Sequence, residues 1–336
     1  MEKTRVLSMK NIHSLEHYES RPPLPVLSDV NFAINTGETW GIYAETAFET
    51  KLLLQIIGGV RPFVGQYQLF GKTINPKKPN NPPKLFYIGT PRMPYPNMNV
   101  LEYLMFTTEK TDFQFQDIDP VDYLDYSTAK DALKRVYRQE ELLEQLISLG
   151  LDYLALSPLK RLYDDERAVV ALIAASYSEN PVIVFNFPEY EFPDFLACSI
   201  PKIVERATLN GKTTLLGLCD PDLIEAVASH SLYLVDGQML YSGKIDELRH
   251  RHDKIVAYVC DEHIDKIYAT LTPLLLDYEL WIDDNALIIR DKNNKKEFPS
   301  RVYQTIVSAG LSPDAIEINE KTVRNAYQEL LRQHDL

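Results

Sequence analysis

Cysteines and long apolar runs are scarce in this 336-residue sequence, and their scarcity argues against several classes of protein. The three cysteines, Cys198, Cys219 and Cys260, have neither an even count nor metal-ligand spacing, which argues against a disulfide framework and indicates a reducing compartment. The seven histidines show no ligand-like spacing, so we expect no metal site. The longest apolar run, from Ala168, is about half a membrane span, and the first ten residues contain no apolar signal segment. We therefore expect a cytoplasmic protein that does not itself insert into a membrane.

Basic residues are also fewer than acidic ones. The chain carries 48 acidic and 35 basic residues, a net charge of -13, which opposes contact with a phosphate backbone. Nucleic acid is therefore not an expected partner. With 45% hydrophobic and 25% charged residues the composition is that of a soluble globular protein, and the length favours two domains.

Strand and helix patterns alternate along the first 250 residues. Alternating or continuous apolar runs predict strands at 29–34, 39–44, 66–71, 84–90, 181–188, 213–219 and 231–243. Helical periodicity predicts helices at 51–60, 100–162 in several pieces, 165–180, 200–211 and 222–230. Such alternation predicts an α/β fold with a mostly parallel sheet covered on both faces.

A charged stretch at 244–253 separates this region from a shorter one with a different pattern. We expect domains at 1–248 and 253–336. The second domain reads βαββαβα, an order that predicts a small α+β, ferredoxin-like module.

The stretch GIYAETAFETKLLL, residues 41–54, reads as a buried strand, a tight loop and a leucine-rich helix. Phosphate-binding loops occur at such junctions with the pattern G-x-x-x-x-G-K-[ST]. The glycines let backbone N–H groups approach the phosphates, the lysine neutralises their charge and the hydroxyl binds Mg²⁺. The stretch has the layout of such a loop without its glycines.

The residues after this stretch narrow the interpretation. Pro62, Gly65 and Gly71 fall in the frame P-x-x-G-x-x-x-x-x-G. With the preceding strand, loop and helix, this frame resembles the nucleotide-binding subunit of ATP-binding cassette (ABC) transporters, and the resemblance continues to about Gly243, roughly three quarters of the chain. It implies a phosphate-loop-type parallel sheet with an antiparallel β subdomain and a helical subdomain at about 100–165.

The resemblance also shows which side chains occupy the family's phosphate-loop positions. Ala44, Ala47 and Glu49 stand at the glycines, Thr50 at the lysine and Lys51 at the hydroxyl residue. The remaining altered positions of the loop are Glu45 and Leu52. Carboxylates in the loop would repel a triphosphate where a helix N-terminus should attract it. Lys51 could partly compensate, or it could simply extend from the first turn of a core helix.

The other family motifs are altered as well. Thr90 stands at the glutamine that binds Mg²⁺, Asn186 at the magnesium aspartate, Phe187 at the glutamate that activates water, and Cys219 at the histidine that senses the γ-phosphate. A phenyl ring cannot accept a proton. The signature loop falls on Leu162, Tyr163, Asp164, Asp165 and Glu166, followed by an arginine. Ordinary packing is the simpler interpretation of each residue taken alone. Tyr18 is a weak candidate for the residue that stacks on adenine.

These resemblances imply a degenerate ATP-binding subunit of an ABC transporter that couples to a membrane permease without competent ATP hydrolysis. The last 80 residues resemble the small C-terminal domain of some exporter-type members. Expected partners are a permease, for which residues 90–106 form the family's docking region, and a second cassette subunit in a homodimer or heterodimer. Expected localisation is cytoplasmic, peripheral at the inner face of the membrane.

Two other interpretations stay open. One is a divergent but active ATPase in which Lys51, Asn186 and Glu189 or Glu191 replace the lost groups. The other is a soluble adaptor that keeps only the fold. No cofactor is expected, and ATP with Mg²⁺ would bind only under the active-ATPase interpretation.

Overall fold

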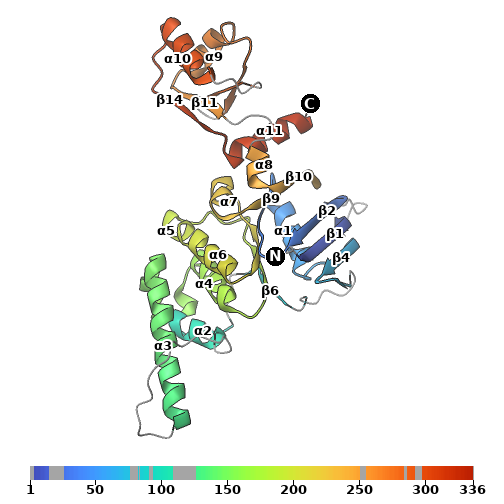
Figure 1. Ribbon diagram of the computed structural model, residues 1–336, viewed down its shortest axis with the longest axis vertical. Coiled ribbons are helices and arrows are strands. Elements are labelled where there is room, and N and C mark those ends of the chain that lie inside the picture. Colours follow the sequence, from blue (N-terminus) through green and yellow to red (C-terminus); the bar gives the residue numbers. More distant parts are fainter. Residues whose placement is uncertain are drawn as a thin grey trace. The chain divides into compact units, whose positions relative to one another are not determined.

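Strands and helices alternate through the first of two units, Met1–Ser242 and Gly243–Leu336 (Figure 1). The computed structural model describes residues 4–14, 26–75, 82, 84–90, 94–108, 126–249, 255–283, 286–291 and 297–335. Tyr18 lies outside these described residues. No helix among them is both long and apolar enough to cross a bilayer.

A six-stranded sheet with the order β10-β9-β3-β8-β7-β6 forms the centre of the first unit. Its strands are β3 (Thr39–Ala44), β6 (Leu85–Ile88), β7 (Val182–Asn186), β8 (Thr213–Gly217), β9 (His230–Val235) and β10 (Gln238–Lys244). Strand β3 pairs in parallel with β8 and β9, and β7 pairs in parallel with β6 and β8. Every residue of β7 and β8 is buried, as expected for strands covered on both faces. The predicted parallel sheet is confirmed.

A four-stranded antiparallel sheet lies beside it, with the order β2-β1-β4-β5. Its strands are β1 (Arg5–Ser14), β2 (Val30–Asn35), β4 (Phe63–Leu69) and β5 (Lys72–Thr73). The sequence pattern did not reveal β1. Register shifts interrupt its pairing with both neighbours, and Asn11 has φ 51°, so the alternation that marks a strand is broken in the middle.

The helices of the first unit are α1 (Ala47–Ile57), α2 (Val100–Thr107), α3 (Tyr126–Leu149), α4 (Asp164–Tyr177), α5 (Asp194–Ala197), α6 (Ser199–Leu209) and α7 (Pro221–Val227), with short 3-10 turns at Asp152–Leu154 and Leu159–Arg161. Helices α1, α4, α6 and α7 pack on the six-stranded sheet, whereas α2 packs between α3 and α4, beside it (Figure 1). Helix α1 lies on the side of the antiparallel sheet, and α4 and α6 lie on the opposite side (Figure 1). Helix α1 begins at Ala47, four residues before its predicted start. The glutamate and threonine of its first turn are therefore helical rather than part of a loop.

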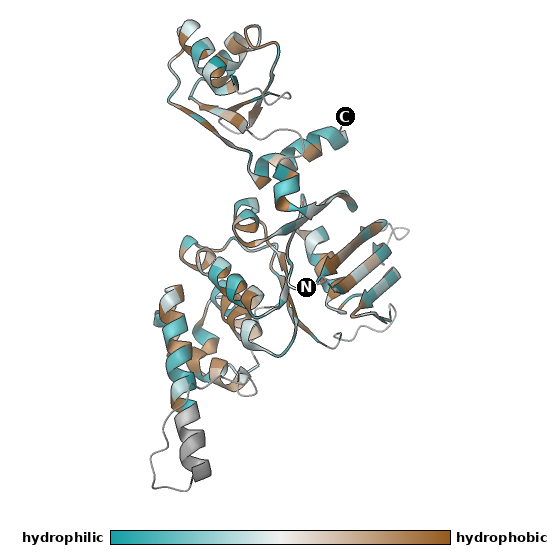
Figure 2. Ribbon diagram, viewed as in Figure 1, coloured by the Kyte–Doolittle hydropathy of each residue, from teal (hydrophilic) through white to brown (hydrophobic). Residues whose placement is uncertain are grey.

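One apolar core joins the two sheets of the first unit. It contains residues of β1 and β2 together with the buried leucines and isoleucines of α1 and the central strands, and brown, apolar stretches mark these strands in Figure 2. The core thus fixes α1 between the two sheets, and with it the loop that precedes the helix.

The second unit has its own sheet and its own core. Its elements are α8 (Ile245–Arg249), β11 (Ile255–Cys260), α9 (Ile264–Leu271), β12 (Glu279–Asp283), β13 (Ala286–Arg290), α10 (Phe298–Ser308), β14 (Ala315–Glu320) and α11 (Val323–Asp335). All neighbouring strands are antiparallel, in the order β12-β13-β11-β14. The two βα crossovers therefore interleave as in a ferredoxin-like module, and the predicted α+β fold is confirmed.

Candidate functional site

The candidate site lies where β3 passes into α1, near the carboxyl ends of the parallel strands. In α/β sheets this edge is the usual place for a ligand. The loop between β3 and α1 is short, because Ala44 ends the strand and Ala47 begins the helix. Ala44 is buried, Glu45 is exposed, and Leu52 is buried in the core.

Glu49 turns inward from the first turn of α1. Only 7% of its surface is exposed, and its carboxylate accepts hydrogen bonds from the Gly237 backbone N–H and the Thr46 side chain. Its Oε2 atom is buried without a hydrogen-bond partner. Burial raises the pKa of Glu49, the two hydrogen bonds lower it, and the nearby carboxylates of Asp236 and Glu45 raise it further. A carboxyl group thus occupies the position of a glycine in the phosphate-loop pattern.

Thr50 occupies the lysine position of that pattern and faces the interior. It is 1% exposed. A Cβ placed on Gly217 of β8 would lie 2.9 Å from its methyl carbon and 2.4 Å from Leu54 Cδ1. The Thr50 side chain therefore fills the space that Gly217 leaves open on β8, the strand that pairs with β3. It provides packing and no positive charge.

Lys51 forms an ion pair across the end of the sheet. Its Nζ atom lies 2.6 Å from Oε2 of Glu189, and the two side chains are 33% and 48% exposed. The lysine charge is therefore directed at a carboxylate of the segment after β7.

Asn186 and Phe187 follow each other at the end of β7 and are both buried. The Asn186 amide donates to the Lys51 carbonyl oxygen at 3.0 Å and to the Tyr87 hydroxyl at 2.9 Å, while its Oδ1 atom is buried without a partner. The Phe187 ring packs against the rings of Phe185 at 4.6 Å and Tyr190 at 5.3 Å between centroids. Asn186 therefore links β7 to α1 and β6, and Phe187 is an aromatic residue of the core.

Cys219 follows β8 and its thiol donates to the Tyr190 carbonyl oxygen at 3.0 Å. Burial raises the pKa of this thiol, and the carboxylates of Asp220 and Glu191 act in the same direction. The sulfur is therefore a hydrogen-bonded thiol that also faces negative charge. Thr90 is exposed just after β6 and has no described contact with the loop.

The signature-loop positions form the beginning of α4. Leu162 is buried, whereas Tyr163 is 77% exposed. Asp164, Asp165 and Glu166 fill the first helical turn. Glu166 accepts from the Tyr163 backbone N–H at 2.9 Å, and Asp164 pairs with Arg167 at 2.8 Å.

All of these residues except Glu166 line an open hollow of about 530 Å³, together with Tyr190 and Glu191. The acidic side chains place negative charge at the positive end of the helix dipole, where an anionic ligand would otherwise bind.

The structure brings some candidate residues together and separates others. Lys51, Asn186 and Glu189 lie in contact, as the active-ATPase interpretation requires. Glu191 instead lies with the signature-loop residues. Among the described residues, no group of three or more His, Cys, Asp or Glu side chains is placed to hold a metal ion.

Three hydrogen bonds of the site could not be predicted from the sequence. The Tyr87 hydroxyl accepts from the Asn186 amide, the Gly237 backbone N–H donates to Glu49, and the Tyr233 hydroxyl donates to Glu45. Tyr233 also stacks on Tyr43 at 5.8 Å between ring centroids. Each partner comes from a strand or turn far away in the chain, and no local spacing marks it. Asp236-Gly237, with φ 49° and 74°, could have been recognised as the turn of a hairpin, but not as a partner of the loop.

Comparison with known proteins found similarity only at the level of structure. No family model matches the sequence, and no curated protein matches it. A nucleotide-free ATP-binding cassette from an ABC transporter matches with a TM-score of 0.51 and 18% identity, over 72% of this chain and 92% of the other. The first unit has the fold of an ATP-binding cassette.

Two further cassettes match equally well. One is the ADP conformation of MJ1267, an ATP-binding cassette of an ABC transporter, with a TM-score of 0.52 and 18% identity over 73% and 92% of the two chains. The other is a dimeric post-hydrolysis state of the cassette MJ0796 bound to ADP and phosphate, with a TM-score of 0.52 and 17% identity over 71% and 98%. The cassette fold therefore accounts for almost the whole of these proteins and for the first unit of this one.

Proposed function

We propose that this chain is a degenerate ATP-binding subunit of an ABC transporter, of the exporter type, which couples to a membrane permease without hydrolysing ATP itself. The observation that carries the proposal is the inward-turned Glu49, whose carboxylate occupies the loop from which a cassette would contact phosphates. The proposed partners are a permease and a second cassette subunit, the same or different. The proposed place of work is the inner face of the membrane.

Charge at the loop supports the lack of ATP binding. Glu45, Glu49 and Glu189 carry three formal negative charges against one positive charge on Lys51, so the group has a net charge of -2. Two like charges 4 Å apart repel by about 4 kcal/mol at an effective dielectric constant of about 20. Because Lys51 is already paired with Glu189, it offsets little of this repulsion. The residues present therefore do not fit a magnesium triphosphate.

The positions of the family's catalytic groups support the lack of hydrolysis. Phe187 is buried among aromatic rings and cannot accept a proton from water. In a cassette dimer each site combines the phosphate loop of one subunit with the signature loop of the other. Since this chain has altered both, we propose that it would disable both sites of a heterodimer as well as both sites of a homodimer.

Mg-ATP titration of the full-length protein tests the proposal. A ligand at about 100 times its Kd stabilises a fold by about 2.7 kcal/mol, which raises Tm by several degrees. We expect no such rise with millimolar Mg-ATP, no saturable heat in calorimetry, and the same result for Lys51→Ala.

One observation favours the active-ATPase alternative, namely the contact of Lys51, Asn186 and Glu189. The same titration distinguishes the two. Micromolar affinity together with turnover that Lys51→Ala abolishes would overturn the proposal. Circular dichroism of the variant ensures that a lost signal reflects chemistry rather than unfolding.

A further inference from the structure

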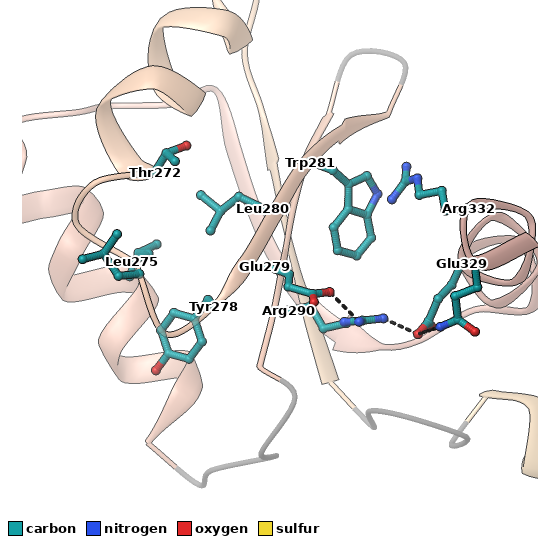
Figure 3. A pocket seen from close by; sticks show the side chains of 11 residues that line it. Thr272, Leu275, Tyr278, Glu279, Leu280, Trp281, Arg290, Glu329 and Arg332 are labelled. Carbon is teal, nitrogen blue, oxygen red and sulfur yellow. Dashed lines mark hydrogen bonds and ion pairs between the residues drawn. The ribbon is translucent and has the colours of Figure 1, made fainter. Parts of the chain in front are cut away.

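Two hollows of similar size, one in each unit, differ in the charge of their linings. The hollow beside β12 in the C-terminal unit is lined by two arginines and two glutamates, whose charges cancel, and Figure 3 shows Arg290 bonded to both glutamates. The hollow at the start of α4 is lined by three carboxylates and one guanidinium group, a net charge of -2. These are Asp164, Asp165, Glu191 and Arg167. The hollow at α4 therefore carries unbalanced negative charge.

The arginine that lines the hollow at α4 is directed at groups of its own segment. Arg167 pairs with Asp164 at 2.8 Å and donates to the carbonyl oxygens of Leu159 and Lys160 at 3.1 Å and 3.3 Å. The carboxylates are open to solvent, since the side chain of Asp164 is 54% exposed and Glu191 is also exposed. The end of the helix supplies only about half a positive charge, which these carboxylates outweigh.

Two tyrosines lie among the carboxylates of this hollow. Tyr163 is 77% exposed, and Tyr190 is half-buried. Burial raises the pKa of Tyr190, and the carboxylates of Asp164, Glu189 and Asp165 raise it further. The negative charge of the α4 turn therefore reaches the tyrosine on the other side of the hollow.

A second pair of exposed rings adjoins the hollow. Tyr153 and Phe195 are 52% and 53% exposed, and their rings meet edge to face with 6.3 Å between centroids. The Tyr153 hydroxyl donates to Glu166 at 3.3 Å, and the same carboxylate group accepts from the Tyr163 backbone N–H. Grouped exposed aromatic side chains are typical of protein interfaces. We call the following residues the aromatic-acidic surface: Tyr153, Tyr163, Tyr190, Phe195, Asp164, Asp165 and Glu191.

We propose that the aromatic-acidic surface docks a basic, arginine-bearing segment of a different protein. A guanidinium group suits both parts of this surface, because it stacks on aromatic rings and binds carboxylates through two parallel hydrogen bonds. Charge complementarity selects this occupant over a second copy of the chain, which itself carries a net charge of -13. The proposal goes beyond the function proposed above and holds whether or not the chain works in a transporter.

Calorimetry of the full-length protein at low salt tests the proposal, with the peptide acetyl-Gly-Arg-Gly-Arg-Gly-amide as the probe. We expect saturable binding with a Kd of about 1 mM or lower. The citrulline analogue keeps the shape of arginine without its charge, so it should bind about tenfold or more weakly. The lysine analogue keeps the charge but lacks the planar group that stacks and bonds twice, so it should bind about threefold or more weakly.

Four variants separate this surface from the general effect of an acidic protein. Tyr163→Ala should bind the arginine peptide about fivefold or more weakly, and Glu191→Gln about tenfold or more weakly. Both residues are exposed, so neither variant should lower Tm. The matched controls are Tyr303→Ala, whose ring is 43% exposed on α10, and Glu205→Gln on the exposed side of α6. Both should bind the peptide as the wild type does.

The absence of saturable binding by the wild type overturns the proposal, as does equal binding of the arginine peptide and either analogue. Equal losses in the control variants would also contradict it, because the peptide would then respond to net charge alone. Sedimentation of the protein without peptide checks the remaining occupant. Self-association that Tyr163→Ala abolishes would assign the surface to a second copy of the chain.

Discussion

At the scale of single residues, the altered positions of the candidate site are built into the packing of the fold. Thr50 fills the space above Gly217, Asn186 links β7 to α1 and β6, and Phe187 belongs to an aromatic cluster. Restoring a family residue at one such position would therefore remove packing as well as add a ligand group. It follows that stability should respond to these substitutions more strongly than activity.

The substitution Phe187→Glu tests whether stability responds more strongly than activity. The ring is 1% exposed and touches two other rings. Replacing it with a carboxylate loses its apolar contacts and buries a charge, so we expect a loss of at least about 3 kcal/mol in the free energy of unfolding and no gain of ATPase activity. Phe187→Leu, which stays apolar, should cost no more than about 1.5 kcal/mol. Urea denaturation measures both. A stable Glu variant would show that the position is open to the site.

The buried carboxyl group of Glu49 predicts that the stability of the fold depends on pH. Because its pKa is raised in the folded protein, the unfolded chain releases this proton first as the pH rises. The folded state then binds more protons, so stability falls with rising pH until the folded pKa is passed, and stays lowered above it. Glu49→Gln lacks this loss. Its Tm relative to the wild type should therefore increase as the pH rises above the ordinary glutamate pKa of about 4.3.

The exposed Glu179 provides the matched control for this experiment. Glu179→Gln removes the same formal charge without a buried carboxyl group, and its Tm difference should show no such trend. A difference for Glu49→Gln that stays constant or shrinks with pH would contradict the buried position of the carboxylate.

At the scale of elements, helix α4 begins with a run of carboxylates that can stabilise its N-terminus. Its first turn carries Asp164, Asp165 and Glu166. Carboxylates at a helix N-terminus each stabilise it by about 0.3–1 kcal/mol. The three acidic side chains thus complement the positive end of the helix dipole.

The double variant Asp164→Asn and Asp165→Asn tests this stabilisation. It keeps the size and one acceptor oxygen of each side chain and removes the charges, including that of the Asp164–Arg167 ion pair, so we expect a loss of about 1 kcal/mol in the free energy of unfolding, smaller at high salt. Glu205→Gln, an exposed carboxylate of α6 away from its first turn, should change stability by less. An unchanged or increased stability of the double variant would mean that the acidic turn is not stabilised by the dipole.

The sequence predicted those elements whose burial leaves a regular pattern. Strands β3 and β7 are covered on both faces, so their apolar runs identified them directly. Strand β1 was missed because its bulges break the alternation. The site positions were predicted by counting along the chain, and they stay predictions. The contacts of Tyr87, Tyr233 and Gly237 could not be predicted, because they depend on which strands become neighbours in the folded sheet.

At the scale of the whole molecule, the function proposed for the chain requires a surface for the permease. The segment after β6 and helix α2, where we propose that a permease docks, exposes two aromatic side chains. Tyr95 and Phe106 are 41% and 47% exposed, and their rings meet edge to face at 5.1 Å. Exposed aromatic pairs are typical anchors of protein interfaces.

If these two rings contact a permease, then removing both should release the protein from the membrane. We expect the double variant Tyr95→Ala and Phe106→Ala to lower the membrane-bound fraction of the full-length protein about tenfold, as for the loss of a small hot spot. Leu209→Ala is the control, because Leu209 is 81% exposed at the end of α6, outside this segment. Sedimentation of native membranes, followed by extraction in mild detergent, measures the bound fraction. A wild-type protein recovered wholly without membrane would favour the soluble adaptor, whereas equal loss in both variants would place the contact elsewhere on the cassette.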